Sequence, residues 1–145
     1  PKFIKEAGKI NAIIPKWIVS NIENVLKKKN LQIKKIKILI IGVAYKKNID
    51  DDRESPAYEI INSLKKKCLK VTYHDPYIYK ISETRKFKSL KNLKSIDLNK
   101  KNINKFDAIV IVTDHDNINY SLISNSSKIV FDCRNRFSSV NKKKK

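Results

Sequence analysis

Residues 36–57 read IKILIIGVAYKKNIDDDRESPA, a run that combines a strand, a turn and the start of a helix. Positions 36–41 are apolar apart from one lysine, are rich in β-branched side chains and end at Gly42, which predicts a buried parallel strand. After a polar loop, Ser55 and Pro56 are residue types preferred at the N-cap and the first position of a helix. We therefore expect a helix from Pro56 whose buried face carries its apolar residues: Ala57, Ile60, Ile61 and Leu64.

Strand signals recur along the rest of the chain. Further strands are expected at 71–73, 108–112 and 128–131, with a short helix at 118–122 and short irregular elements with some helix over 79–105. Alternating strands and helices indicate an α/β fold, a Rossmann-like, mostly parallel sheet flanked by helices.

A long helical arm is expected before this sheet. Apolar residues in 2–29 recur close to the helical period, and Pro15 should either kink this helix or begin a second one. The arm carries an apolar stripe that must be buried, either on its own domain or on a partner subunit: Ile10, Ile14, Trp17 and Ile18. The chain then divides into the arm (1–30), the α/β domain (33–140) and a basic tail (141–145).

The composition of the 145-residue chain sets limits on its class. Hydrophobic residues make up 41%, which suffices for the core of one domain. No apolar run approaches the ~18 residues that span a bilayer, and no signal-peptide pattern is present, so we expect no membrane association and a cytoplasmic protein.

The formal charge of +19 raises the question of a polyanionic partner. Only four of the 33 basic residues are arginine; lysine, asparagine and isoleucine, the residues of AT-rich codons, are abundant instead. Specific nucleic-acid readers use arginine forks or aromatic platforms, and neither is clustered here. We therefore expect no specific nucleic-acid partner and attribute the charge to compositional drift.

Basic residues gather where the strands end. Ligands of such sheets bind beyond the carboxyl ends of the strands. Four cations are expected at this edge: Lys46, Arg53, Arg134 and Arg136. They suit a diphosphate beside a helix N-terminus, but a solvated basic loop explains them equally well. The acidic run 50–52 could pair with these cations or hold a divalent metal.

The turn after the first strand differs from a dinucleotide-binding fingerprint. It contains Gly42 alone where that fingerprint needs three glycines, so Asp75, at the place of a ribose-binding acid, carries little weight. Cys68, Cys133 and the two histidines lack metal-ligand spacing. We expect no NAD site of the usual kind, no metal site and no stand-alone catalytic residues.

Four quoted stretches resemble the C-terminal domain of the UDP-glucose/GDP-mannose dehydrogenase family, in the same order. They are ILIIGVAYKKNIDDDRESPA at 38–57, HDPY at 74–77, FDAIVIVTDH at 106–115 and VFDCRN at 130–135. Residues 10–15 also resemble the central helix that joins the two halves of these enzymes and forms their dimer. The motifs AYK at 44–46 and DRESPA at 52–57 most resemble the UDP-N-acetylglucosamine 6-dehydrogenase branch.

The resemblance implies a function that the residues alone leave open. These enzymes use NAD to oxidise the C6 alcohol of a UDP-sugar to a uronate for polysaccharide biosynthesis, through a cysteine thiohemiacetal. Lys46 and Arg134 would bind the UDP-sugar, which the resemblance to that branch implies is a UDP-N-acetylhexosamine. Arg53 would reach the pyrophosphate of NAD. Most of the NAD site and the catalytic cysteine belong to an N-terminal half, so this chain should be inactive alone and should form a homodimer through residues 2–29. The alternative is a basic binding or interaction module without catalysis.

One departure from the family concerns Cys68. It stands where glycine is expected after the first helix, and a left-handed backbone there would cost ~1 kcal/mol.

Overall fold

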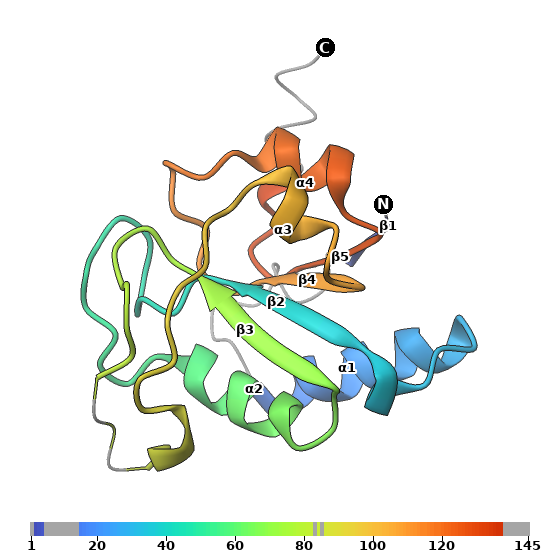
Figure 1. Cartoon of the computed structure of the whole chain (residues 1–145), viewed down its shortest axis with the longest axis horizontal. Helices are drawn as coiled ribbons and strands as arrows, with labels where there is room; N and C mark the ends of the chain where they lie inside the picture. Colours follow the sequence, from blue (N-terminus) through green and yellow to red (C-terminus); the bar gives the residue numbers. More distant parts are fainter. Residues whose placement is uncertain (1, 5–14, 83, 85, 138–145) are drawn as a thin grey trace.

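A five-stranded, all-parallel sheet forms the centre of the computed structural model, which describes residues 2–4, 15–82, 84 and 86–137. The order of the strands across the sheet is β1-β5-β4-β2-β3 (Figure 1). Their bounds are β1 Lys2–Ile4, β2 Lys37–Ile41, β3 Lys70–His74, β4 Ala108–Ile111 and β5 Ile129–Asp132. The chain passes from β2 outward to β3 and then back to β4 on the other side of β2, so the strand order reverses between β2 and β4. The predicted Rossmann-like sheet is confirmed, and the four expected strands agree with the structure to within one residue at each end.

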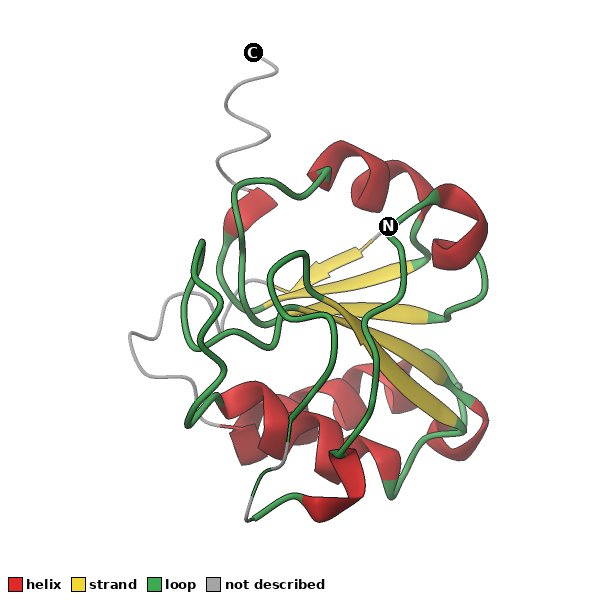
Figure 2. Cartoon of the chain, turned by 60° about the vertical axis from the view of Figure 1, so that its left-hand side comes forward, coloured by secondary structure: helices red, strands yellow, loops and turns green. Residues whose placement is uncertain are grey.

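Helices cover both faces of the sheet (Figure 2). The helical elements are α1 Pro15–Lys28, η2 Ile33–Lys35, α2 Pro56–Lys65, η3 Lys88–Leu90, α3 Lys100–Ile103 and α4 Tyr120–Ser126. Alternate residues of β2 point into two different cores: Ile38 and Ile40 join the core under α1 and α2, whereas Leu39 and Ile41 join the core under α3 and α4. This two-sided burial explains why the strand reads as a continuous apolar run.

The start of α2 follows from its first residues. The Ser55 hydroxyl accepts a hydrogen bond from the Ala57 N–H at 3.2 Å, and Pro56 occupies the first helical position. Both predictions are confirmed. The predicted buried face is also confirmed, with Tyr58 as an additional member.

The arm departs from the prediction at its start. Residues Lys2–Ile4 form β1, which pairs in parallel with β5, and are not helical. Three residues carry too short a pattern to distinguish a strand from a helix, so pairing with β5 decides their conformation. Residues 5–14, with Ile10 and Ile14 of the predicted stripe, lie outside the described residues.

Helix α1 begins at Pro15, which confirms the predicted alternative that Pro15 starts a second helix. Its apolar residues Ile18, Val19, Ile22 and Leu26 are buried in the same core as α2. For this part of the arm, packing on its own domain is therefore the alternative that the structure shows. Trp17 remains 38% exposed.

Cys68 does not adopt a left-handed backbone, so that prediction is wrong. Positive φ occurs elsewhere among the described non-glycine residues, at Asn30, Asn48, Glu54, Asn92 and Asn135. The Cys68 N–H donates to the Leu64 carbonyl at 2.8 Å, and the next N–H, from Leu69, donates to Ile36. The chain thus passes from α2 into β3 through turns in which Cys68 keeps a negative φ, so this position does not require glycine.

Within the described part of the chain, no helix is long and apolar enough to cross a bilayer. The expected cytoplasmic location stays a prediction.

Candidate functional site

The candidate site lies where β2 and β4 end, at the reversal of strand order that commonly holds ligands in such sheets. Gly42 follows β2 with φ of +91°. A Cβ atom on Gly42 would lie 2.4 Å from the Thr113 Cβ and 2.8 Å from the Thr113 backbone nitrogen. The Thr113 hydroxyl also donates to the Ala44 carbonyl at 2.8 Å. Glycine is thus required because the loops after β2 and β4 touch backbone to backbone.

A buried carboxylate, Asp75, organises the turn after β2. One of its oxygens accepts the N–H groups of Val43 at 2.8 Å and Ala44 at 2.9 Å. Its other oxygen accepts those of Tyr77 at 2.8 Å and Ile78 at 3.2 Å. In dinucleotide-binding sheets the N–H groups of this first turn face a phosphate. Here an internal carboxylate occupies them, which makes this turn unsuited to an NAD pyrophosphate.

The same carboxylate faces His115, whose side chain is fully buried. The His115 Nε2 lies 3.0 Å from the Asp75 Oδ2, and the His115 Nδ1 accepts the Asn48 N–H at 2.8 Å. Because Nδ1 is used as an acceptor, the proton of the neutral ring lies on Nε2 and is donated to Asp75. The Tyr77 ring packs against the imidazole, with centroids 4.7 Å apart.

Opposing effects act on the ionisation of Asp75. Burial acts to raise its pKa, but hydrogen bonds from His115 and from backbone N–H groups favour the carboxylate and leave the pKa below its ordinary value. The pair is therefore a charged carboxylate with a neutral histidine, a structural arrangement with every buried group satisfied.

These contacts shape the loop that carries Lys46. The Tyr45 N–H donates to the Asp51 carbonyl at 2.7 Å and closes the loop. Asn48, with φ of 65°, exchanges two hydrogen bonds with Asp116, of 2.7 and 2.9 Å. Between these anchors Lys46 is exposed, and its ammonium makes no hydrogen bond or ion pair with the described residues.

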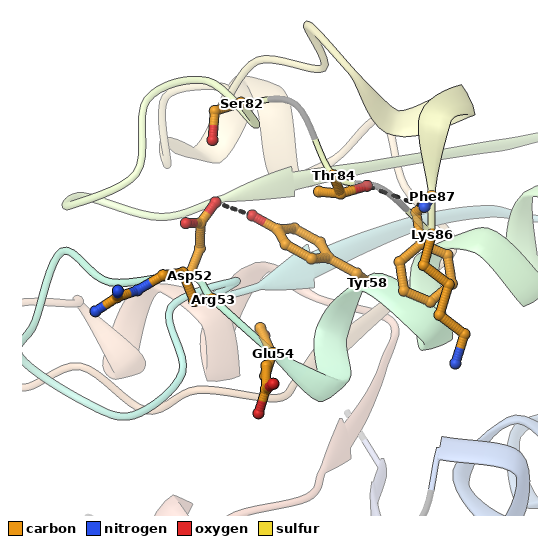
Figure 3. A pocket seen from close by; sticks show the side chains of 9 residues that line it. Asp52, Arg53, Glu54, Tyr58, Ser82, Thr84, Lys86 and Phe87 are labelled. Carbon is orange, nitrogen blue, oxygen red and sulfur yellow. Dashed lines mark hydrogen bonds between the residues drawn. The ribbon is translucent and has the colours of Figure 1, made fainter.

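Arg53 is engaged by a neighbour in its own loop. Its Nε and Nη2 donate to the two oxygens of Asp51 at 3.0 and 2.8 Å, and its side chain is 85% exposed. These hydrogen bonds hold the pKa of Asp51 at about 2. Asp52 instead accepts the Tyr58 hydroxyl (Figure 3). The acidic run is thus divided between separate partners, and no cluster of three potential metal ligands occurs among the described residues.

Arg134 and Arg136, which follow β5, converge on the carboxylate of Asp114, which follows β4. Asp114 lies 3.6 Å from the Arg134 Nε and 3.7 Å from the Arg136 Nη1. Arg136 also contacts Asp116 at 2.8 Å and lies over the Tyr120 ring, 4.6 Å from its centroid. Hydrogen bonds from Arg136 and Asn48 hold the pKa of Asp116 at about 2.

The structure brings the predicted cations to one edge without joining them directly. Lys46 and Arg134 lie on loops that are connected through Asn48, Asp116, Arg136 and Asp114. Arg53 shares a shallow depression of about 330 Å³ with Tyr45, Asp51 and Glu54. A larger pocket of about 590 Å³, which Arg53 also lines, lies between the loop before α2 and the segment around Ser82, Lys86 and Phe87 (Figure 3).

Both thiols are unsuited to nucleophilic chemistry. Burial raises the pKa of Cys68 to about 11 and that of Cys133 to about 12, and the two cysteines are unpaired. A reactive cysteine needs the opposite shift.

The residues that sequence reasoning missed are Asp75, His115 and Asn48. From the sequence, Asp75 is a candidate only for a ribose ligand and His115 only for a metal ligand. The available signal is their position: Asp75 follows β3 and His115 follows β4, the two neighbours of β2 in the sheet, and Asn48 lies in the loop after β2 itself.

Comparisons with known proteins agree with this architecture. Residues 39–139 match the model of the UDP-glucose/GDP-mannose dehydrogenase family, UDP-binding domain. A UDP-N-acetyl-D-mannosamine dehydrogenase of Methanococcus maripaludis is 32% identical over 142 residues, which is 92% of this chain and 30% of the relative. The corresponding enzyme of Methanococcus vannielii is 33% identical over 114 residues, covering 79% of this chain and 24% of the relative.

A solved structure of a UDP-D-ManNAc dehydrogenase from Pyrococcus horikoshii superimposes with a TM-score of 0.63 at 27% identity, covering 81% of this chain and 26% of that one. The chain therefore spans less than a third of the length of these relatives. Their names point to N-acetylmannosamine and not to the N-acetylglucosamine branch expected from the sequence. At the level of the family the prediction is confirmed: the chain belongs to the UDP-glucose/GDP-mannose dehydrogenase family and contains its UDP-binding domain.

Proposed function

We propose that this chain is the nucleotide-sugar-binding part of an NAD-dependent UDP-N-acetylhexosamine 6-dehydrogenase, which oxidises the C6 alcohol of the sugar to a carboxylate. The observation that carries the proposal is the match to the UDP-binding domain, because residues 39–139 include the whole sheet edge with Lys46, Arg53 and Arg134. The names of the similar relatives favour N-acetylmannosamine as the sugar.

Two cations are assigned to the diphosphate of the substrate. Lys46 is exposed and without a partner among the described residues, so it can meet a phosphate without first breaking an ion pair. Arg134 is held by Asp114 across 3.6 Å only, a long contact that a phosphate oxygen can replace.

Arg53 is assigned to NAD. Its guanidinium already makes a two-pronged contact with Asp51, which shows that its fork can grip a planar pair of oxygens. The turn after β2 cannot do so, since Asp75 occupies its N–H groups. The remainder of the NAD site and the catalytic cysteine would come from another part of a longer enzyme, so this chain alone would form no NADH.

Calorimetry on the purified chain tests the binding role. UDP and UDP-N-acetylmannosamine should bind and GDP should bind more weakly. Lys46→Ala should lower UDP affinity about tenfold or more, as expected for losing a charge-assisted hydrogen bond. Lys47→Ala is the matched control, because Lys47 lies in the same loop but faces Asp116 at 3.9 Å. A preference for GDP, or equal losses in both variants, would contradict the assignment.

A further inference from the structure

We propose that Asp75, His115 and Asn48 are positioning residues for nucleotide-sugar binding: they form a relay of hydrogen bonds that holds the exposed tip Tyr45–Lys47 in its binding conformation. This inference rests on the proposed function and extends it to residues that lie behind the site. None of the three is assigned to ligand contact, and the family match does not single them out.

The relay fixes the loop at its first end through Asp75. The carboxylate accepts the N–H groups of Val43 and Ala44, which immediately precede the tip. Tyr77 and Ile78 hold the same carboxylate from the other side, so its position is determined by four backbone donors.

The relay fixes the loop at its second end through His115. Its Nδ1 accepts the N–H of Asn48, the residue that immediately follows the tip, while its Nε2–H is donated to Asp75. The side chains of His115 and Asp75 have zero exposure, so no water competes for the bond between them. One buried pair therefore binds both ends of a three-residue tip.

Asn48 completes the relay at the surface. Its left-handed backbone turns the chain back toward β4, and its amide exchanges two hydrogen bonds with Asp116, which Arg136 also contacts. The tip between these anchors is exposed at Tyr45, Lys46 and Lys47. A tip that is ordered in advance avoids the entropic cost of ordering it when the ligand binds.

His115→Phe tests the relay while keeping the fold. Phenylalanine preserves a ring beside Tyr77 and leaves Asp75 its four backbone donors, and the freed Asn48 N–H belongs to an exposed residue that water can reach. We expect UDP affinity to fall about tenfold or more, from the lost preorganisation, at temperatures well below the melting midpoint. The amide of Tyr45, bonded to Asp51 and not to His115, should exchange its hydrogen faster.

His74→Phe is the matched control. His74 is a partly buried histidine at the same end of the sheet, and its Nδ1 lies 2.7 Å from the Ile96 carbonyl, away from the tip. It should lower stability to a comparable extent without changing UDP affinity or Tyr45 exchange. Asn48→Gly, which keeps the left-handed backbone and the N–H but loses Asp116, should give an intermediate loss of affinity.

The outcomes separate the two proposals. If the wild-type chain binds no UDP, the proposed function fails, and Tyr45 exchange still tests the relay. If His115→Phe binds UDP as the wild type does, or if its Tyr45 amide exchanges at the wild-type rate, the positioning role is overturned. Should His115→Phe fail to fold, wild-type affinity and exchange in Asn48→Gly would overturn it equally.

Discussion

Asp75 combines a buried charge with four backbone hydrogen bonds, and one substitution tests these two contributions together. Asp75→Asn keeps the size of the side chain but turns amide hydrogens toward groups that are themselves donors. We expect a loss of about 3 kcal/mol in the free energy of unfolding, measured in urea. Asp97→Asn, at an exposed aspartate, should change it little. A small loss at Asp75 would mean that the carboxylate is not what holds the turn.

The pH dependence of stability gives a second view of this group. Its folded pKa lies below the ordinary value, so the carboxylate contributes stability that is fully present above the unfolded pKa of about 4 and is lost as the pH falls through the folded pKa. As the pH is lowered from 5, Asp75→Asn should therefore lose less stability than the wild type, because asparagine has no carboxylate to protonate. An unchanged acid limb in the variant would contradict the shift.

Arg53 can be tested only in a complete enzyme. Arg53→Lys removes the fork that grips two oxygens at once. If Arg53 meets the pyrophosphate of NAD, the KM for NAD should rise about tenfold while the KM for UDP-sugar and the melting midpoint stay nearly constant. If Arg53 serves only as a strut for its loop through Asp51, stability and both KM values should change together.

Single residues were predictable from the sequence to different degrees. Lys46, Arg53 and Arg134 were chosen because charge and family resemblance both mark them. The roles of Asp75 and His115 could not be predicted, because they depend on partners that include residues 31 to 67 positions away in the chain. Only the sheet topology brings those partners together.

Among the elements, the contact between the loops after β2 and β4 depends most on one position. Gly42→Ala would place a Cβ atom against the Thr113 side chain and its backbone at a φ of +91°. We expect a loss of at least about 2 kcal/mol in unfolding free energy. The double variant Gly42→Ala/Thr113→Gly should remain less stable than Thr113→Gly alone, because the Thr113 backbone nitrogen would still lie 2.8 Å from the added Cβ atom. Full rescue in urea unfolding would show that the side chain alone causes the conflict.

Elements with local signals were predicted well, and those without were not. Ser55 and Pro56 mark the start of α2 in their own chemistry, and β2 is marked by its unbroken apolar run. The strand β1 has no such signal, since its three residues become a strand only through the free edge of β5. The sequence likewise left open whether the apolar residues of α1 pack on their own domain or on a partner subunit, because only tertiary packing decides this.

For the whole molecule, the burial of α1 changes how self-association should be tested. Removing residues 1–30 would uncover the core that Ile22 and Leu26 fill, so a truncated chain would report on folding and not on assembly. We instead propose Trp17→Glu, at a residue 38% exposed on α1. If the helix forms a dimer through its exposed side, this substitution should yield monomers by sedimentation and change the melting midpoint little. Asn125→Glu, at an exposed position of α4 on the opposite face of the sheet and with the same change of charge, is the control. A wild-type chain that sediments as a monomer would refute the dimer.

The pairing of β1 with β5 also determines how the molecule would respond to tension. The two strands run parallel, with Lys2 beside Ile129 and Ile4 beside Phe131. A pull applied before residue 2 and after residue 132 therefore enters this pair at opposite ends and acts along the strands. Under such a load the backbone hydrogen bonds between the strands must shear together and cannot peel apart one at a time. The force passes through β1 and β5 at the side of the sheet (Figure 1). The loop contact at Gly42 and the loop that carries Lys46 therefore stay unloaded while the pull is applied.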